Sequence, residues 1–486
     1  MTTTQTDTHK QHPLRIGDEW VTTKSWTDVR SPWDQRLVGQ VATGGPDLAS
    51  HAVDCAERAL QSPMPRHERA EILERMATLL EEQSEVFAHS ISAEAGKPIT
   101  LARGETERGA ITLRSAATAA RTLTGTTVPM DAHETGDGHI GWIARVPIGI
   151  VGAITPFNFP LNLVLHKVAA AIAAGCPVVL KPASQTPITA LHLARITERA
   201  GLPPGWLNVV VGPAAEIAHV LTSDPRVRLI TFTGSAAVGE SLRTTTRYAR
   251  LSLELGNMTP VIVDSTADLA AAASAIAVSA CNYSGQTCVS TQRVFAHHSI
   301  IDDLRSLLVE QMSAIQSGDP QLDEVLNGPM INSAEHQRVL QWISDAEQAG
   351  ARVLLGGTDA GNSVIAPTLV EAVPARSALG SHEVFGPVAT LDAVPDLDAA
   401  FSRANATPYG LQASLFTGNI SSMMRAADRL QFGSVLINES PSFRADHMPY
   451  GGTKSSGNTK EGPAYAIRDM TEERLIVLNH APSLLT

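Results

Sequence analysis

Residues 148–182 read IGIVGAITPFNFPLNLVLHKVAAAIAAGCPVVLKP, and this stretch decides the fold class. Two short apolar runs, 148–154 and 176–182, flank a longer Ala-rich run with helical composition at 161–175. Buried strands of a parallel sheet read as continuous apolar runs, and parallel neighbours need a crossover connection that is usually a helix. The stretch therefore predicts a β-α-β unit with parallel strands.

The same alternation continues along the chain after this unit. Further β runs lie at 207–212, 227–234 and 250–256, separated by helical patterns at 188–201, 214–224 and 236–246. Alternation of this kind is typical of a doubly wound α/β sheet. A second α/β series runs from PVIVDS at 260–265 to about residue 437 and predicts a separate lobe.

The segment that precedes residue 148 has a different pattern. Residues 47–121 carry apolar side chains at helical spacing, with Gly96, Lys97 and Pro98 as an internal stop. Between 125 and 143 the helical signal fades into Thr, Gly and polar residues, and a β-rich run follows. This segment predicts a projecting hairpin.

Because the sequence has no internal repeat and no long linker, we expect the two lobes to pack tightly.

The composition is that of an ordinary globular protein, with 43% hydrophobic and 18% charged residues among 486. At roughly 100 to 200 residues per domain, this length suggests two substantial domains. The formal charge of −12 comes from 37 Lys and Arg against 49 Asp and Glu, and the acidic residues are scattered. We therefore expect no nucleic-acid partner.

Membrane and export signals are absent from the sequence pattern. The first dozen residues, MTTTQTDTHKQH, are polar. The longest apolar run, near 168–180, is shorter than the roughly 20 residues that cross a bilayer. We therefore expect a cytoplasmic protein with no membrane partner.

The four cysteines are Cys55, Cys176, Cys281 and Cys288. They form no CxxC pair and show no spacing that zinc requires, so we expect neither a metal site nor a disulfide framework. Most thiols of this kind are buried packing residues. We expect that role for Cys176 and Cys281, and only the neighbours of a cysteine can indicate that it reacts.

A nucleotide site is expected at the carboxyl ends of the parallel strands. Gly234 and Ser235 follow the β run at 227–234 and open a helix, where free N–H groups and the helix dipole favour a pyrophosphate. The alternative is a simple capped turn, since the GxGxxG fingerprint is absent. Lys181 ends a predicted strand, where its cation could contact a ribose hydroxyl or a phosphate. The alternative is that Lys181 is a surface lysine. Ser184 is small and neutral, so a 2′-phosphate is tolerated there.

Seven motifs occur in a fixed order, and on them the chain resembles the aldehyde dehydrogenase superfamily over nearly its whole length. They are Pro156-Phe157-Asn158-Phe159-Pro160, Lys181-Pro182 with Ser184, Phe232-Thr233-Gly234-Ser235 with Gly239, Glu254-Leu255-Gly256, Gly285-Gln286-Thr287-Cys288, Glu383-Val384-Phe385-Gly386-Pro387, and Pro449-Tyr450-Gly451-Gly452-Thr453-Lys454. The segments 443–452 and 465–472 look like the branch with lactaldehyde, phosphonoacetaldehyde and non-phosphorylating glyceraldehyde-3-phosphate dehydrogenases.

The resemblance implies an α/β fold of three parts. They are a Rossmann-type cofactor domain (1–124 and 148–254), an α/β catalytic domain (255–455), and a β-rich oligomerisation arm (125–147 and 456–486), which implies a homodimer or homotetramer. The implied cofactor is NAD or NADP. Its binding residues would be Thr155, Pro156, Lys181, Ser184, Gly234, Ser235, Leu255, Glu383 and Phe385.

The resemblance also implies a chemistry. Cys288 is the nucleophile that forms a thioester, Asn158 and the Cys288 backbone N–H stabilise the oxyanion, and Glu254 activates water. Without the resemblance, the position of Glu254 at the end of a strand would favour a surface carboxylate, and Asn158 could simply organise a turn. The chain departs from the family pattern at Asn257, where a second glycine is common, and at 456–461, where SGNTKE replaces an SGxGRE run.

The implied substrate pocket is unusually polar. It would contain Arg108, His166, Thr287, Arg444 and Tyr450, with Leu163 and Val289. Two arginines and a histidine suit a small polar or anionic aldehyde, such as a phosphonate-bearing aldehyde or lactaldehyde. The alternatives are that Arg108 is a solvated helix residue and that Arg444 faces another subunit. Some relatives with phosphorylated substrates have an arginine immediately before the nucleophile. In this chain that position is Thr287, which carries no charge.

Two other functions stay open on the sequence. One is a CoA-acylating aldehyde dehydrogenase, although the retained Glu254 favours hydrolysis. The other is a non-catalytic binding or structural member of the same fold, against which Cys288, Glu254 and Asn158 argue.

Overall fold

The five-stranded parallel sheet in the first half of the chain positions the predicted nucleotide site. The computed structural model describes residues 11–479. The polar first residues and the end of the predicted arm lie partly outside this range. The strand order is β10-β9-β8-β11-β12. The bounds are β8 Ile150–Ile154, β9 Val178–Lys181, β10 Leu207–Val209, β11 Val227–Thr233 and β12 Arg250–Glu254.

All four pairings in this sheet are parallel, which confirms the α/β prediction. The crossover helices are α5 Asn162–Ala174, α6 Ile188–Arg199, α7 Ala214–Ser223 and α8 Ala236–Thr245. Every residue of β8 and of α5 is buried, and burial on all sides explains why these segments read as continuous apolar runs.

Four helices and a set of short strands precede this sheet. The helices are α1 Pro46–Leu60, α2 Arg66–Glu82, α3 Ser84–Ala95 and α4 Ile99–Thr122, and α4 packs against α2, α3 and α5. The strands are β1 Gln11–His12, β2 Leu14–Ile16, β3 Glu19–Val21, β4 Ser25–Arg30 and β5 Leu37–Thr43. Gly96 ends α3 in the left-handed conformation, which agrees with the stop expected there.

The second lobe contains a seven-stranded sheet of order β15-β18-β19-β14-β13-β20-β21, parallel except for β15. Its strands are β13 Thr259–Val263, β14 Thr291–His297, β15 Arg352–Leu355, β18 Thr368–Glu371, β19 Val388–Val394, β20 Gln412–Phe416 and β21 Ser434–Ile437. A small hairpin is formed by β16 Asp359–Gly361 and β17 Val364–Ile365. The helices are α9 Leu269–Cys281, α10 Ile301–Ser313, α11 Ser333–Gln348, α12 Ala378–Ser381, α13 Leu397–Asn405 and α14 Ile420–Arg429.

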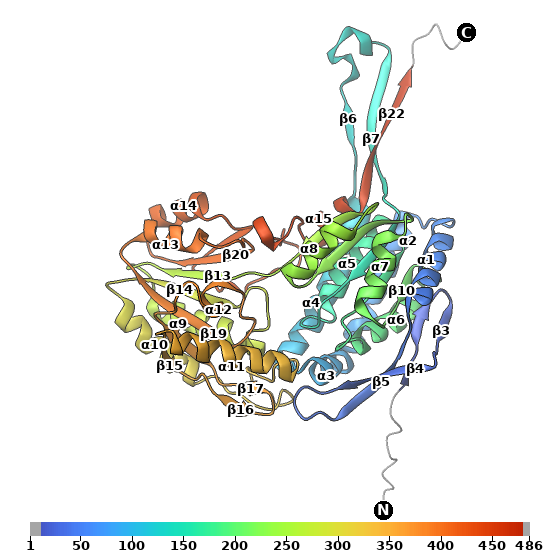
Figure 1. The fold of residues 1–486 in the computed structure, drawn as a ribbon. Coiled ribbons are helices and arrows are strands. Elements are labelled where there is room, and N and C mark those ends of the chain that lie inside the picture. The colour runs from blue at the N-terminus through green and yellow to red at the C-terminus, as the bar shows by residue number, and fades with distance from the viewer. Residues whose placement is uncertain (1–10, 480–486) are drawn as a thin grey trace, which may run out of the picture.

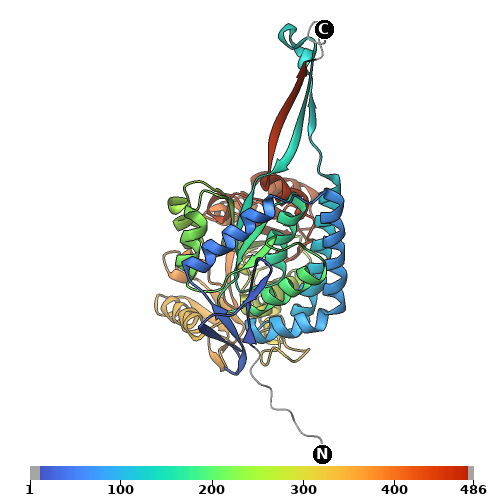
Figure 2. The ribbon, with the colours of Figure 1, turned by 90° about the vertical axis from the view of Figure 1, so that its right-hand side faces the viewer.

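A three-stranded antiparallel arm projects from the body, as Figures 1 and 2 show from two sides. It consists of β6 Thr126–Val128, β7 His139–Pro147 and β22 Thr471–Asn479, in the order β22-β7-β6. The short helix α15 Pro463–Asp469 precedes β22 and packs against α4 and α5 in the body. Exposed apolar side chains gather on this arm: Ile140, Trp142, Leu475, Val477 and Leu478. Within residues 11–479, no helix combines the length and apolar character needed to cross a membrane.

Candidate active site

A cavity of about 740 Å³ opens at the carboxyl ends of β8, β9 and β11. Thr155 and Pro156 follow β8, Lys181 ends β9, and Ser184 lies three residues further on, exposed at the cavity wall. The opposite wall comes from α7 and α8. Parallel α/β sheets bind nucleotides at this edge, so this cavity is the candidate cofactor site.

A second cavity of about 340 Å³ adjoins the first, because both are lined by Pro156, Thr233 and Gly234. It extends between the two lobes to the predicted nucleophile. The predicted site residues that line it are Pro156, Asn158, Gly234, Ser235, Leu255, Cys288, Glu383 and Phe385. The structure therefore brings most of the predicted cofactor and catalytic residues together around one continuous space.

The N-terminus of α8 faces the first cavity. The Ser235 hydroxyl caps this helix by accepting a hydrogen bond from the Val238 N–H at 3.4 Å. A Cβ at Gly239 would lie 2.5 Å from the Leu255 side chain, so the close approach of α8 to Leu255 requires glycine there. The free N–H groups of a helix start favour a pyrophosphate.

Glu383 lies at the far end of the second cavity. Its Oε1 accepts a hydrogen bond from the Asn257 N–H at 2.9 Å, and burial raises its pKa to about 7. Asn257, which departs from the family pattern, donates through Nδ2 to Thr259 Oγ1 at 2.8 Å and to the Gln412 carbonyl at 3.1 Å. Asn257 therefore connects the segment after β12 to the second sheet. A buried carboxylate at this place can accept hydrogen bonds from a ribose diol, and the two cavities together fit a nicotinamide dinucleotide.

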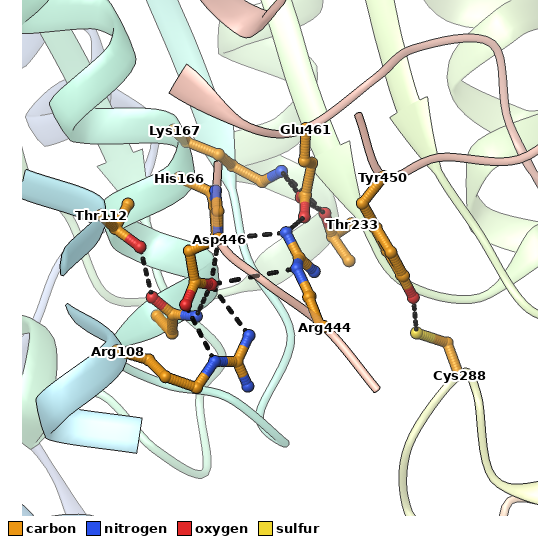
Figure 3. Close-up of polar contacts among 11 residues, drawn as sticks. Arg108, Thr112, His166, Lys167, Thr233, Cys288, Arg444, Asp446, Tyr450 and Glu461 are labelled. Atoms are coloured by element: carbon orange, nitrogen blue, oxygen red, sulfur yellow. Dashed lines mark hydrogen bonds and ion pairs between the residues drawn. The ribbon is translucent and has the colours of Figure 1, made fainter. Parts of the chain in front are cut away.

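Cys288 follows a tightly wound turn. Tyr283 and Ser284 adopt left-handed conformations with φ of 49° and 55°, and Gly285 follows at 63°. Backbone strain of this kind is held only where the surroundings fix it, and it is common at functional sites. Cys288 is half-buried, and its sulfur lies 2.8 Å from the Tyr450 hydroxyl (Figure 3). Burial raises the pKa of the Cys288 thiol to about 12, while the Tyr450 hydrogen bond lowers it.

Asn158 is connected to the nucleophile loop by a hydrogen bond. Its Nδ2 donates to the backbone carbonyl of Gln286 at 2.9 Å. Its Oδ1 is buried and has no partner within the described part of the chain. The hydrogen bond fixes the amide plane and leaves the second N–H of Nδ2 for an oxygen bound beside Cys288.

Glu254 ends β12 and is only 3% exposed, so it is not a surface carboxylate. Among residues 11–479, neither of its carboxylate oxygens has a hydrogen-bond partner. Burial, and then the charge of Glu461, raises its pKa well above the usual value, against the opposing charges of Lys167 and Arg444. A buried carboxylate with free oxygens and a raised pKa has the properties of a general base.

Arg108 forms a two-point ion pair with Asp446 (Figure 3). Its Nε donates to Asp446 Oδ2 at 3.0 Å and its Nη2 to Oδ1 at 2.9 Å. His166 Nε2 lies 3.1 Å from the same Oδ1, and Asn162 Nδ2 donates to it at 2.9 Å. Arg108 is therefore held by a partner that the sequence reading missed, and is not a simply solvated helix residue.

Arg444 lies between this pair and Tyr450 (Figure 3). Its Nη2 donates to Glu461 Oε2 at 2.8 Å, and its guanidinium carbon lies 4.0 Å from the centre of the Tyr450 ring. Lys167 reaches the other Glu461 oxygen at 3.4 Å and donates to Thr233 Oγ1 at 2.7 Å. Burial opposes ionisation of Glu461, but Lys167 and Arg444 outweigh it and lower the pKa of Glu461 to about 2.

The sequence reading missed three charged residues of this cluster, namely Asp446, Glu461 and Lys167. Lys167 did carry a signal, because it is a lone cation in a run of apolar residues and a fully buried lysine needs a partner. Asp446 and Glu461 lie in loops, where no periodicity marks a buried carboxylate.

Thr287 lies beside the nucleophile, and its hydroxyl has no hydrogen-bond partner within the described residues.

Comparisons with known proteins show the family of the chain. The model of the aldehyde dehydrogenase family matches residues 20–476. The chain is 41% identical over 470 residues to the 3-sulfolactaldehyde dehydrogenase of Priestia aryabhattai, covering 97% of this chain and 98% of that protein.

Two solved structures agree with the predicted branch. Lactaldehyde dehydrogenase from Escherichia coli superimposes with a TM-score of 0.93 and 32% identity, covering 96% of this chain and 99% of that one. Glyceraldehyde-3-phosphate dehydrogenase GapN from Methanocaldococcus jannaschii, in complex with NADP, has a TM-score of 0.90 and 33% identity, covering 94% and 100%. The resemblance is confirmed, and the chain belongs to the aldehyde dehydrogenase family, as an oxidoreductase that acts on aldehydes with NAD or NADP.

Proposed function

We propose that this protein oxidises a small aldehyde with an anionic or strongly polar group to the carboxylic acid, through a thioester on Cys288. Candidate substrates carry a sulfonate, a phosphonate or a hydroxyl group on a short carbon chain. The observation that carries this proposal is Arg444, a largely buried cation that the Tyr450 side chain separates from the Cys288 sulfur. A relative of 41% identity named for a sulfonated aldehyde supports the same substrate class.

The charges around Arg444 favour an anion. Arg108, Lys167 and Arg444 supply three positive charges, against the two carboxylates of Asp446 and Glu461. Burial lowers the pKa of His166, so its imidazole adds no positive charge to this cluster. Arg444, whose side chain is 11% exposed, lies among these charges and can form a charge-assisted contact with an anionic ligand.

The first chemical step is assigned to Cys288 and Asn158. The Cys288 thiolate attacks the carbonyl carbon, and the carbonyl oxygen becomes an oxyanion. The free Asn158 N–H and the Cys288 backbone N–H stabilise that oxyanion, and one such donor is worth about 3 kcal/mol in the barrier. Nicotinamide, when bound, supplies the hydride acceptor for the oxidation.

The second step is assigned to Glu254. It takes a proton from a water molecule, whose oxygen attacks the thioester carbon, and the C–S bond breaks to release the acid and the thiolate. The buried and unpaired carboxylate of Glu254 supports hydrolysis over transfer to CoA, which needs no such base.

For the cofactor, we infer that both NAD and NADP are accepted. Lys181 and Ser184 line the outer wall of the larger cavity, and Ser184 carries no charge that would repel a 2′-phosphate. We also infer that the chain is divided into the domains expected from the sequence, with two lobes around the site. The arm would pair subunits into a homodimer or homotetramer. The exposed apolar side chains of β7 and β22 support this role for the arm.

A substrate panel tests the proposal. We expect kcat/KM for 3-sulfolactaldehyde, phosphonoacetaldehyde or lactaldehyde to exceed that for propanal, with both NAD and NADP. Arg444→Gln should lower the preference for the charged aldehydes about tenfold or more, since a charge-assisted contact is lost. Arg195→Gln, at an exposed cation on α6 that lines neither cavity, is the control. Equal efficiencies for charged and uncharged aldehydes would rule out the anionic substrate class.

A further inference from the structure

Tyr450 contacts the reacting sulfur directly. Its hydroxyl lies 2.8 Å from Cys288 Sγ, and its side chain is 3% exposed. Its backbone is fixed by two hydrogen bonds with Glu461, one in each direction, at 3.2 and 2.6 Å. In Figure 3 the ring stands between Arg444 and Cys288, with the hydroxyl pointing at the sulfur. The phenol is therefore held in place at the nucleophile.

The direction of this hydrogen bond depends on the state of Cys288. While Cys288 is a thiol, either atom can donate. When the S–H bond breaks, its electrons stay on sulfur and the proton passes to water, so the sulfur can only accept. We propose that Tyr450 is a catalytic residue that stabilises the Cys288 thiolate by donating its phenol O–H. This inference rests on the proposed role of Cys288 as nucleophile.

The other charged groups that face Cys288 make such a donor necessary. Glu254, at the end of β12, and Glu383, in the loop after α12, both oppose ionisation of the thiol, as burial does. Arg444 is the cation that favours ionisation. It acts at a distance, because the Tyr450 ring lies between it and the sulfur.

Arg444 also strengthens the phenol as a donor. A cation on the face of an aromatic ring attracts the electrons of that ring, and its guanidinium carbon is 4.0 Å from the ring centre. Glu461 and Lys167, behind Arg444, hold the guanidinium in this place. If this position served only as an apolar wall, a phenylalanine ring would be sufficient. Tyr450 instead carries a hydroxyl, and within the described chain its one polar contact is with Cys288.

Alkylation of Cys288 by iodoacetamide tests the proposal without turnover. The thiolate attacks the reagent carbon and iodide leaves, so the rate below the thiol pKa rises about tenfold per pH unit. Cys55, Cys176 and Cys281 are buried, and peptide mass analysis identifies the product at Cys288. We expect Tyr450→Phe to slow this alkylation about 10- to 100-fold at each pH between 7 and 9, since a hydrogen bond to a charged group is lost.

The pH profile of kcat/KM for propanal should move upward by one to two units in the same variant. Tyr248→Phe, at an exposed tyrosine, should leave both measurements unchanged. Tyr450→Phe removes one oxygen and keeps the aromatic ring, so thermal melting should show an intact fold. Equal alkylation rates in the wild type and in Tyr450→Phe would overturn this inference. Aldehyde oxidation by Cys288→Ala would instead overturn the proposed function.

Discussion

Arg108 and Asp446, 338 residues apart in the chain, form a two-point ion pair beside the candidate active site. The Asp446 side chain is 2% exposed and that of Arg108 is 29% exposed. His166, Asn162 and Arg444 complete the surroundings of the carboxylate. The pair fixes the loop that carries Arg444 and Tyr450 onto helix α4, so the geometry of the pocket depends on it.

Arg108→Ala should destabilise the protein by about 2 kcal/mol, because a buried carboxylate loses its main partner. Thermal or urea unfolding measures this change. Arg103→Ala, which removes an exposed arginine of the same helix paired with Glu85 and Asp323, should cost less than about 1 kcal/mol. Similar losses in the two variants would contradict a structural role for the Arg108 pair.

Glu254→Gln should stop turnover after the first reaction cycle. An amide cannot take a proton from water, so the thioester accumulates while the first oxidation proceeds, and kcat falls about 100- to 10,000-fold. Stopped-flow absorbance of the reduced cofactor measures the burst. Glu310→Gln, at an exposed carboxylate on α10, should keep full turnover. A fully active Glu254→Gln protein without a burst would refute water activation by Glu254.

Glu461 should make stability depend on pH on the acid side. Its pKa is about 2 in the folded protein, below the ordinary value of 4.5, so its ionised form favours folding. That contribution is complete above pH 4.5 and is lost as the pH falls toward 2.

Glu461→Gln should therefore be less stable than the wild type at pH 7 and should lose less stability between pH 6 and pH 3. Melting curves across this range check the prediction. Glu439→Gln, at an exposed carboxylate, should follow the wild type. If the stability of Glu461→Gln falls with decreasing pH as steeply as that of the wild type, ionised Glu461 does not stabilise the fold.

Ser184→Glu should reduce the use of NADP relative to NAD. A carboxylate at this wall of the cavity would face the 2′-phosphate, and like charges at short range should cost about tenfold or more in kcat/KM. Ser184→Ala, which adds no charge, should keep the wild-type ratio. An unchanged ratio in Ser184→Glu would place the 2′-phosphate elsewhere.

The sequence was sufficient for features that depend on local pattern. The parallel strands β8 and β9 follow from apolar runs around an Ala-rich helix, and Ser235 as a helix cap follows from its place after β11. The grouping of Asn158, Glu254 and Cys288 came from the family resemblance, since no periodicity relates residues so far apart.

The ion pairs of the pocket could not be predicted in the same way. Asp446 and Glu461 lie in loops, and their partners depend on how the last segments of the chain fold over α4 and α5. The contact of Tyr450 with Cys288 is also a tertiary relationship, between the loop that follows β21 and the loop that precedes β14. Such contacts are fixed by packing, which a single sequence does not record.

The pairing of β7 with β22 has a consequence for the synthesis of the chain. Arg145 and Glu473, an ion pair on these strands, are 328 residues apart. At about 5 to 20 residues per second, β7 leaves the ribosome on the order of half a minute before its partner exists. During that time one edge of a strand with exposed Ile140 and Trp142 stays open, and such edges recruit other strands. A nascent chain therefore needs protection at β7, and truncation before β22 should favour aggregation over folding.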